Sequence, residues 1–427
     1  MSIQELYELY LGYPHVQTDS RKVKPGELFF ALKGDRFNGN AFAARALADG
    51  AAYAIVDEAA YATEDRCILV DDALSTLQQL AHHHRLQLDI PVVGVTGSNG
   101  KTTTKELLVA VLSRRYKTYA TEGNLNNHIG VPLTLLKIRP DAGMAIIEMG
   151  ANHIGEIAAY CRIANPDYGL ITNCGKAHLE GFGSMEGVRK AKGELYDHLR
   201  AFDGTIFRNA DLDYLKDMAK GIEKQITYGT ANAQIIGKAT GDGALLQVTL
   251  LTSQLETQIQ TQLVGAYNLP NVLAAVAVGH HFDVPVEDIK AALETYLPSN
   301  SRSQWLEKGD NKIILDAYNA NPSSMKLAVE NLAALPGDNK WLLLGAMKEM
   351  GQESAAEHQA LADLIGAHGF RNVILTGPEF AETQHTYLWF ADSAQARDYL
   401  QLHPIHQALV LIKGSRGSRM ELVLEAF

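Results

Sequence analysis

The sequence predicts an α/β protein of three domains that are built mainly on parallel sheets. The first observation is length, because 427 residues are too many for one ordinary hydrophobic core. The second is the alternation of short apolar strands with helical segments, which is typical of parallel sheets. The third is a glycine-rich turn between one such strand and a helix, "VTGSNGKTTTKE" at residues 95–106.

The positions of these strand and helix patterns predict the bounds of the first two domains. Residues 1–88 are expected to form a small α/β domain, since the strands "GELFFAL" and "AAYAIVD" flank the helical segment "AFAARALADG". Residues 89–298 are expected to form the central domain, which begins where Pro91 opens the strand "PVVGV" before the glycine-rich turn. We predict that this central domain is of the P-loop type and carries a parallel sheet.

Residues 299–427 are predicted to form a C-terminal, Rossmann-like α/β domain. Four further strands alternate with helices there: "KIILDAY", "KWLLLGAM", "NVILTG" and "ALVLIKGS". Polar segments follow three of these strands directly: "AYNANP", "AMKEMG" and "KGSRGS". In open α/β sheets ligands gather outside the carboxyl ends of the strands, so these segments are expected to contribute to a site.

Composition and charge narrow the class of function. The net charge of −11 argues against a nucleic-acid backbone as the main partner, since binding one requires a basic face. No apolar run is long enough to cross a bilayer, and "MSIQELYELY" lacks the basic start of a signal peptide. The three cysteines are scattered and show no metal-binding spacing. The sequence therefore predicts a cytoplasmic protein with neither membrane insertion nor a disulfide framework.

Residues 95–106 have the features of a phosphate-binding loop. The two glycines allow backbone N–H groups to approach phosphate oxygens, and the following helix directs its positive end at the anion. Val95 stands where the standard pattern has its first glycine, so the usual kinase and GTPase assignments do not transfer. The alternative is a turn that only caps a helix. The predicted ATP-binding residues of the loop are Gly97, Ser98, Asn99, Gly100, Lys101, Thr102 and Thr103, with Lys101 at the terminal phosphates and the Thr102 hydroxyl on Mg²⁺.

Two further polar residues follow strands of the central domain. "MAIIEMG" places Glu148 at a strand end, and "YGLITNCGKAH" ends in His178. A carboxylate suits Mg²⁺, which prefers hard oxygen ligands. On the pattern alone, Glu148 can equally cap the next helix, and a lone histidine is more often a core residue.

Lys192 interrupts an apolar stripe in the predicted helix "SMEGVRKAKGELYDHL", for which Ser184 is the expected N-cap. Its face also carries, at helical spacing, Val188, Leu195 and Leu199. A different face carries Glu186, Lys190 and Glu194 at the spacing of a solvated salt ladder. A buried ammonium is costly unless it is paired or neutralised. The alternative is a lysine whose long side chain reaches past the stripe to water.

These segments resemble the Mur ligase superfamily. The phosphate loop is similar to the family's loop, and the likeness continues over nearly the whole chain in "TEGNLNNHIGVP", "EMGANHIGEI", "NCGKAHLEGFGS", "AKGE", "DAYNANPSS" and "KGSR". The resemblance implies an ATP-dependent amide-bond ligase that builds peptidoglycan precursors. It also implies two Mg²⁺ ions, with Glu148, His178 and Lys192 at the second ion, and Lys192 converted by CO₂ into a carbamate. A lysine deprotonated by desolvation suits that reaction. The implied catalytic residues are Lys101, His178 and Lys192.

The resemblance also implies nucleotide and substrate contacts. "QTDSRKVKPGELFFALKGDRFNGNAF" resembles the family's uridine-nucleotide domain, and the alternative for its first residues is a turn with a surface arginine. In "VGAYNLPNVLAA" two asparagines match an ATP-contacting helix, whereas Tyr267 stands where histidine is common. The implied ATP contacts beyond the loop are Asn268, Asn271, Arg302 at the phosphates and Asp316 at the ribose. The implied substrate contacts are Asp19, Ser20, Arg21, Asn124, Asn126, Asn127, Asn319, Asn321, Lys413, Ser415 and Arg416.

Within the family, "YNANP" and "AHLEGFGS" are most similar to the members that join D-alanyl-D-alanine to a UDP-muramoyl tripeptide. The resemblance thus implies these two substrates, an acyl phosphate intermediate, and ADP and phosphate as products. We expect a monomer whose last domain closes on its substrates, because the phosphate loop and the "YNANP" and "KGSR" loops belong to different domains. The alternatives are a ligase for a single amino acid, a folylpolyglutamate synthase, or a nucleotide-regulated binding protein without catalysis.

Overall fold

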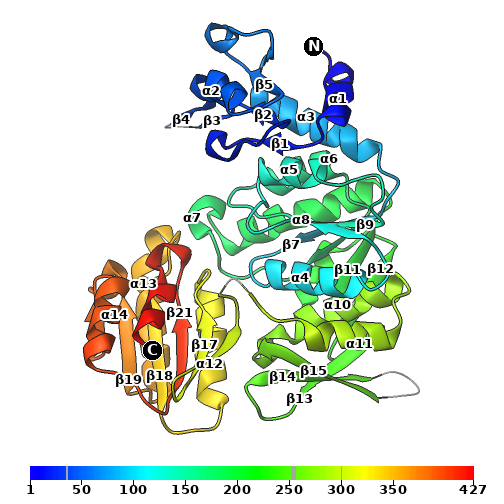
Figure 1. Cartoon of the computed structure of the whole chain (residues 1–427). Coiled ribbons are helices and arrows are strands. Elements are labelled where there is room, and N and C mark those ends of the chain that lie inside the picture. The colour runs from blue at the N-terminus through cyan, green and yellow to red at the C-terminus, as the bar shows by residue number, and fades with distance from the viewer. Residues whose placement is uncertain (35–36, 252–255, 300) are drawn as a thin grey trace.

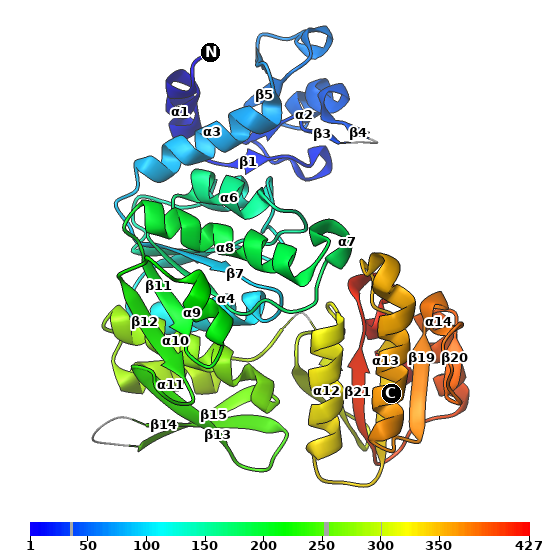
Figure 2. The same cartoon turned by 180° about the vertical axis from the view of Figure 1, so that it is seen from behind.

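The computed structural model describes residues 1–34, 37–251, 256–299 and 301–427. It has three domains, each with its own sheet, and this confirms the predicted α/β class. The N-terminal domain lies at the top of Figure 1, the central domain beneath it, and the C-terminal domain beside the central one. Figure 2 shows the same arrangement from behind. The boundaries at residues 88 and 298 stay predictions.

The N-terminal domain holds four parallel strands in the order β1-β2-β5-β6. These strands are β1 (Val16–Gln17), β2 (Leu28–Phe30), β5 (Tyr53–Val56) and β6 (Cys67–Leu69), and a separate hairpin pairs β3 (Lys33–Gly34) with β4 (Phe37–Asn38). Its helices are α1 (Ile3–Gly12), α2 (Ala43–Ala48) and α3 (Ala73–Leu86). Asp72 caps α3 by accepting a hydrogen bond from the Ser75 N–H.

The central domain holds nine strands in the order β15-β14-β13-β12-β11-β10-β7-β9-β8. They are β7 (Val92–Thr96), β8 (Thr118–Ala120), β9 (Met144–Glu148), β10 (Tyr168–Ile171), β11 (Thr205–Asn209), β12 (Gln225–Gly229), β13 (Ile235–Thr240), β14 (Leu245–Leu251) and β15 (Glu256–Val264). The sheet is parallel from β8 to β13, as predicted, but β14 and β15 are antiparallel. Residues 241–244 between β13 and β14 are too few for the crossover that a parallel pair requires.

Helices cover both faces of the central sheet, so that its middle strands are buried on both sides. The helices of this domain are α4 (Lys101–Leu112), α5 (Gly130–Leu136), α6 (Glu156–Ala164), α7 (Leu179–Phe182), α8 (Met185–Ala201), α9 (Asp213–Met218), α10 (Leu269–His281) and α11 (Val286–Thr295), of which α7 projects toward the C-terminal domain. Alternate residues of β7 point into different cores: Val93 packs with the α4 and α10 residues, whereas Val92 packs with the core under α6 and α8.

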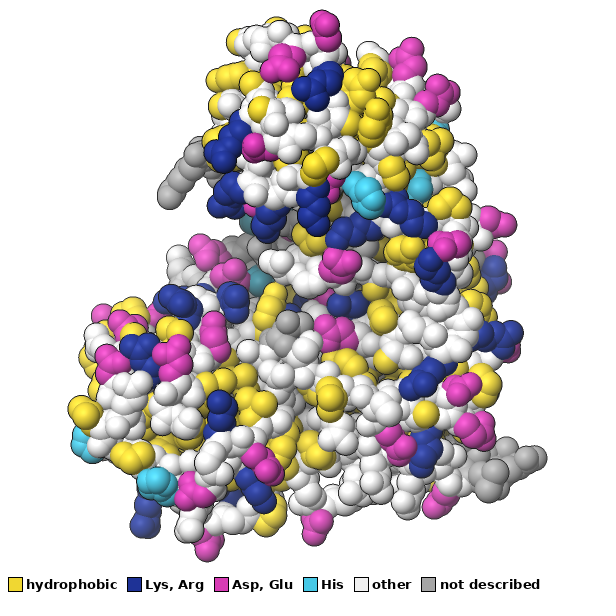
Figure 3. Space-filling model, viewed as in Figure 1, with side chains coloured by type: hydrophobic (Ala, Val, Ile, Leu, Met, Phe, Trp, Pro, Cys, Tyr) yellow, Lys and Arg dark blue, Asp and Glu magenta, His cyan; other side chains and the backbone are white. Residues whose placement is uncertain are grey.

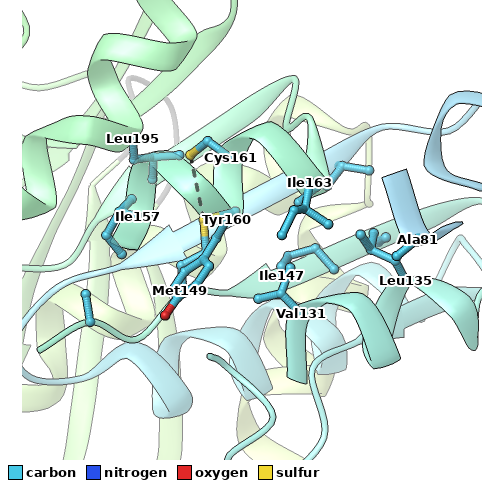
Figure 4. Packing of buried hydrophobic residues seen from close by; sticks show 14 of the residues in the cluster. Ala81, Val131, Leu135, Ile147, Met149, Ile157, Tyr160, Cys161, Ile163 and Leu195 are labelled. Atoms are coloured by element: carbon cyan, nitrogen blue, oxygen red, sulfur yellow. Dashed lines mark hydrogen bonds between the residues drawn. The ribbon is translucent and has the colours of Figure 1, made fainter. Parts of the chain in front are cut away.

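The core under α6 continues without a break into the N-terminal domain. Figure 4 shows Ala81 of α3 in the same apolar layer as Leu135 of α5 and Ile147 of β9. The Cys161 thiol lies 3.8 Å from the Met149 sulfur in this layer. The shared core fixes the position of the N-terminal domain over the central sheet.

The C-terminal domain holds six strands in the order β16-β17-β21-β18-β19-β20. They are β16 (Gln304–Lys308), β17 (Asn311–Asp316), β18 (Lys340–Gly345), β19 (Asn372–Thr376), β20 (Leu388–Phe390) and β21 (Leu409–Lys413), and its helices are α12 (Pro322–Ala334), α13 (Ser354–Ala367) and α14 (Ser393–Leu402). All pairs are parallel except that of β16 with β17. Within the described ranges, none of the helices combines the length and the apolar character needed to cross a membrane.

Candidate active site

The phosphate-binding loop lies between β7 and α4, and both of its glycines are sterically required. Gly97 has a φ of 144°, and a Cβ atom there would lie 2.0 Å from the Thr172 hydroxyl oxygen. Gly100 has a φ of 80°, and its Cβ atom would lie 2.6 Å from the Asn271 side-chain oxygen. Side chains at these positions would therefore strain the backbone and collide with neighbours.

The carboxyl end of the neighbouring strand β10 holds the loop in shape. The Thr172 hydroxyl donates to the Asn99 carbonyl oxygen at 2.6 Å, and the Asn173 side chain accepts from the Asn99 N–H at 3.0 Å. The Ser98 N–H donates to the Asn173 carbonyl oxygen at 2.9 Å. Thr172 and Asn173 were not predicted as site residues, although their position directly after a buried strand was the available signal.

Lys101 begins α4 and curls back onto its own loop. Its ammonium donates to the carbonyl oxygens of Gly97 at 2.7 Å and Ser98 at 3.1 Å. Desolvation lowers the pKa of Lys101, the nearby charge of Glu148 raises it, and the charge of Arg302 lowers it further. Arg302 belongs to the segment that leads into the C-terminal domain, so both domains place positive charge at this loop.

Glu148, at the end of β9, fits a divalent cation. Its side chain is 1% exposed, and Oε1 accepts hydrogen bonds from the Thr102 hydroxyl at 3.1 Å and the Asn126 amide at 2.7 Å. Oε2 is buried and has no hydrogen-bond partner within the described chain. A buried carboxylate oxygen without a partner is costly, and a hydroxyl and a carboxylate are ligands that Mg²⁺ prefers. In the described ranges no three His, Cys, Asp or Glu side chains gather at one point, so an ion at Glu148 would also need ligands of other kinds, such as hydroxyls, water or phosphate.

His178 meets the C-terminal domain. It has a φ of 52° at the start of α7, and its Nδ1 lies 2.5 Å from Oε2 of Glu349. The close contact with His178 lowers the pKa of Glu349. Glu349 was not predicted as a site residue, although it belongs to the polar segment "AMKEMG" that follows a strand.

Lys192 is buried in α8, and the alternative in which it reaches water is wrong. Its side chain is 1% exposed, its ammonium donates to the Ala151 carbonyl oxygen at 3.4 Å, and it lies 5.0 Å from the centre of the Phe182 ring. Burial, followed by the charge of Lys101, lowers the pKa of Lys192 to about 7. The amine is therefore available in its neutral, nucleophilic form near neutral pH. The carbamate stays a prediction.

Elsewhere in α8 the N-cap matches the prediction, and Glu186 and Lys190 are exposed as expected, but Glu194 differs. Ser184 caps the helix by accepting from the Gly187 N–H. Glu194 was expected in a solvated salt ladder, but its carboxylate accepts from the N–H groups of Gly155 at 2.5 Å and Ala158 at 2.9 Å. Because α6 and α8 pack together, Glu194 lies at the positive end of α6.

The predicted residues meet at a cavity of about 850 Å³ between the central and C-terminal domains, which is within the usual size of a ligand site. Predicted residues that line it are Ser98, Asn99, Gly100, Lys101, Thr102, Thr103, Asn124, Asn126, Asn127, Glu148, His178, Asn268, Asn271, Arg302, Asp316, Asn319, Asn321 and Lys413. Others stand outside its lining: Asp19, Ser20, Arg21, Gly97, Lys192, Ser415 and Arg416.

Asparagine side chains shape the wall behind the loop. The Asn271 amide donates to the Asn268 side chain at 2.8 Å, and the Asn271 oxygen accepts from the Thr104 hydroxyl at 3.1 Å. Tyr267 is half-buried beside them, and its hydroxyl lies 3.2 Å from the Ser303 hydroxyl. Tyr267 therefore joins the central domain to the segment that leads into β16.

Polar contacts join the two domains around the cavity. The Asn321 amide, which caps α12, donates to the Asn99 side chain of the phosphate loop at 2.8 Å. The Lys176 ammonium pairs with Glu357 at 2.6 Å, and its backbone N–H donates to the Ser323 hydroxyl at 3.2 Å. The C-terminal domain thus touches the phosphate loop directly.

Asp316 and Lys413 end two adjacent strands of the C-terminal sheet at the same register. The Lys413 ammonium lies 2.5 Å from Oδ2 of Asp316, and the two side chains are 2% and 16% exposed. The Ser303 N–H donates to Oδ1 of Asp316 at 3.1 Å. Lys413 was predicted as a substrate contact, but in this structure its charge is balanced by Asp316.

Asp316→Ala is expected to lower the free energy of unfolding of the C-terminal domain by about 3 kcal/mol, because it leaves the Lys413 ammonium buried without its partner. Asp316→Ala/Lys413→Met should be less destabilised than the single variant. All three tryptophans, Trp305, Trp341 and Trp389, lie in this domain, so urea unfolding followed by tryptophan fluorescence measures it. Equal destabilisation of both variants would show that the pair is not responsible.

In the N-terminal domain, Asp19 and Arg21 pair with each other instead of pointing into a cavity. The guanidinium donates to both carboxylate oxygens at 2.8 Å, and the Arg21 side chain is 80% exposed. The hydrogen bonds with Arg21 lower the pKa of Asp19 to about 2. Figure 3 shows Lys and Arg side chains in a row along the edge of this domain that faces the central one.

The fold and the site together define an ATP-dependent ligase, in which one α/β domain presents a phosphate loop and a second lies against it. Comparisons with known proteins identify the family. The model of the Mur ligase middle domain matches residues 95–279, that of the Mur ligase, glutamate ligase domain matches 301–416, and that of the Mur ligase family, catalytic domain matches 13–85. The chain belongs to the Mur ligase family.

Curated members of this family are similar in sequence to the chain over almost their whole length. The chain is 37% identical to the UDP-N-acetylmuramoyl-tripeptide--D-alanyl-D-alanine ligase of Escherichia coli (strain K12), over 96% of this chain and 93% of that protein. It is 34% identical to the enzyme of the same name from Bacillus subtilis (strain 168), over 96% and 92%.

Solved structures show the same arrangement. MurF from Acinetobacter baumannii matches with a TM-score of 0.88 and 31% identity, over 99% of this chain and 98% of that one. MurF ligase from Thermotoga maritima in complex with ADP matches with a TM-score of 0.88 and 29% identity, over 98% and 97%. A folylpolyglutamate synthase from Mycobacterium tuberculosis, at a TM-score of 0.60 and 14% identity, shares the fold alone.

Proposed function

We propose that this chain joins D-alanyl-D-alanine to the terminal carboxylate of a UDP-N-acetylmuramoyl tripeptide, converts ATP into ADP and phosphate, and acts as a monomer in the cytoplasm. The use of ATP in this proposal rests on the buried Glu148 carboxylate beside Thr102 of the phosphate loop. One oxygen of this carboxylate has no hydrogen-bond partner in the described chain. The names of the curated relatives and the MurF structures support the two substrates.

The reaction has two steps. The tripeptide carboxylate attacks the γ-phosphorus of ATP, ADP leaves, and an acyl phosphate forms. The dipeptide amine then attacks the acyl carbon, loses a proton and releases phosphate. Lys101 and Arg302 provide positive charge that stabilises the phosphoryl oxygens. The cavity between the two domains holds the two reactants next to each other.

The cavity residues also fit bound metal ions. When bound, Mg²⁺ neutralises charge on the phosphoryl group. Thr102 would hold one ion, and Glu148, His178 and a carbamate on Lys192 would hold a second. The pKa of Lys192, lowered to about 7 by its burial, supports the carbamate because only the neutral amine reacts with CO₂.

The substrate contacts divide among the three domains. The ATP contacts would be the phosphate loop, Asn268 and Asn271 of the central domain, Arg302 at the phosphates, and Asp316 of the C-terminal domain at the ribose. The uridine nucleotide would contact Asp19, Ser20 and Arg21 and then pass Asn124, Asn126 and Asn127, and the row of basic side chains in Figure 3 suits its diphosphate. The C-terminal domain would hold the peptide and the incoming amine with Asn319, Asn321, Lys413, Ser415 and Arg416.

Phosphate release tests this function. With ATP, UDP-N-acetylmuramoyl tripeptide and D-alanyl-D-alanine, phosphate should be released in step with a new amide bond, which mass spectrometry of the product measures. Single amino acids in place of the dipeptide should release little phosphate. Release with a single amino acid but not with the dipeptide would assign a different ligase, and ATP binding without release would favour a non-catalytic binding protein.

A further inference from the structure

Arg302 lies in a short segment that the backbone holds in an uncommon shape. Its neighbours Ser301 and Ser303 have φ angles of 55° and 48°, in the left-handed region that residues with a side chain rarely adopt. Two such residues on either side of one arginine persist only where surrounding contacts hold them. The arginine between them lines the same cavity as Lys101.

Tyr318 and its neighbours provide those contacts. The Tyr318 N–H donates to the Ser301 carbonyl oxygen at 3.1 Å, and the Ser303 N–H donates to Asp316 at 3.1 Å. From the central domain, the Tyr267 hydroxyl lies 3.2 Å from the Ser303 hydroxyl. The segment is therefore fastened on both sides of Arg302 and to both domains.

The Tyr318 ring also holds the Arg302 side chain itself. The Arg302 Cζ atom lies over the ring, 3.6 Å from its centre. A guanidinium stacked on a ring uses its face for the contact and keeps its N–H groups, which lie in its plane, for an anion. A carboxylate partner would instead occupy those N–H groups and cancel the charge. The Arg302 Nε is buried and has no hydrogen-bond partner within the described chain.

We propose that Tyr318 is a positioning residue, whose ring holds the Arg302 guanidinium at the cavity with its N–H groups free for the phosphates of a nucleoside triphosphate. The inference rests on the proposed function, because it takes the cavity to be an ATP site. It assigns a reason for tyrosine at the second position of "AYNANP", where the sequence analysis had assigned only the asparagines as contacts.

Calorimetric titration with Mg²⁺ and ATP, without carboxylate substrate, tests this. Tyr318→Leu should weaken ATP binding by roughly 3- to 30-fold, the range of a cation–π contact. Tyr318→Phe, which keeps the ring, should weaken it by less than about 3-fold. Tyr399→Leu removes a tyrosine of the same domain outside the cavity and should leave binding unchanged. Thermal unfolding of each variant shows that it is folded.

The double variant Arg302→Ala/Tyr318→Leu tests whether Tyr318 acts through Arg302 or only supports the local structure. Once Arg302→Ala has removed the guanidinium, adding Tyr318→Leu should cost little further affinity. Additive losses would overturn the proposal, and so would equal losses in Tyr318→Leu and Tyr318→Phe. Failure of the wild-type chain to bind ATP would instead overturn the proposed function. Tight ATP binding that is unaffected by Arg302→Ala would overturn this inference alone.

Discussion

Lys101→Met lowers kcat for phosphate release by about 10²- to 10³-fold, the usual loss when one charged donor to a transferring group is removed. Lys101 begins α4 at the phosphate loop, and its ammonium is held by the carbonyl oxygens of Gly97 and Ser98. Once released from these carbonyl oxygens, the Lys101 ammonium could reach the phosphate, where its positive charge stabilises the negative charge of the transferring phosphoryl group. Steady-state phosphate release with all three substrates measures the loss.

Lys117→Met is the matched control for that experiment. Lys117 is 55% exposed and pairs with Asp141 on the surface of the central domain, outside the cavity. Its removal should change kcat by less than about twofold, since exposed ion pairs contribute little. A Lys101→Met enzyme that keeps its full kcat would show that the loop is only a helix-capping turn.

Lys192→Met lowers kcat by at least about 100-fold if the Lys192 carbamate holds a metal ion at the phosphoryl group. The matched control is Lys190→Met, which removes an exposed lysine two residues earlier on the same helix and should leave kcat unchanged. In wild-type protein supplied with ¹³C-bicarbonate, a carbamate carbon signal should appear in the NMR spectrum and be missing from Lys192→Met. A signal of equal size in both proteins would assign the carbamate to another lysine.

The same carbamate has a defined pH dependence. The pKa of Lys192 lies near 7, below its usual value, because burial disfavours the charged form. The neutral amine that reacts with CO₂ therefore becomes the major form as pH rises through 7. The carbamate signal should grow between pH 6 and pH 8, whereas a lysine of ordinary pKa would remain protonated over this range.

The sequence predicts those residues of the site whose positions depend mainly on their immediate neighbours in the chain. The glycine positions, Lys101 and Thr102 follow one another directly, so the strand–turn–helix pattern places them without reference to the rest of the chain. Glu148 is the last residue of an apolar strand, so the strand pattern is enough to place it at the edge of the sheet. The stripe position of Lys192 left open whether its side chain is buried or reaches water, and in the structure it is buried.

The parts that it does not predict depend on contacts between distant segments. Thr172 braces a loop that lies more than 70 residues earlier in the chain, and Glu349 meets His178 only because the C-terminal domain packs there. Glu194 has the spacing of a salt ladder, yet the amino end of α6 lies closer to it than a lysine does. Helical spacing cannot predict such pairs, because each needs the positions of two packed elements.

The strand pairing that places Asp316 beside Lys413 also determines when the C-terminal sheet can be completed during synthesis of the chain. The strand β21, which carries Lys413, follows every other strand of its sheet in the chain, yet it lies in the middle of that sheet between β17 and β18. The earlier domains can fold while the chain is being synthesised. The C-terminal sheet stays divided until β21 is inserted, and a shift of one residue would turn Lys413 to the other face. A newly made chain therefore cannot place Lys413 beside Asp316, or join β17 to β18, until this last strand of the sheet has been made.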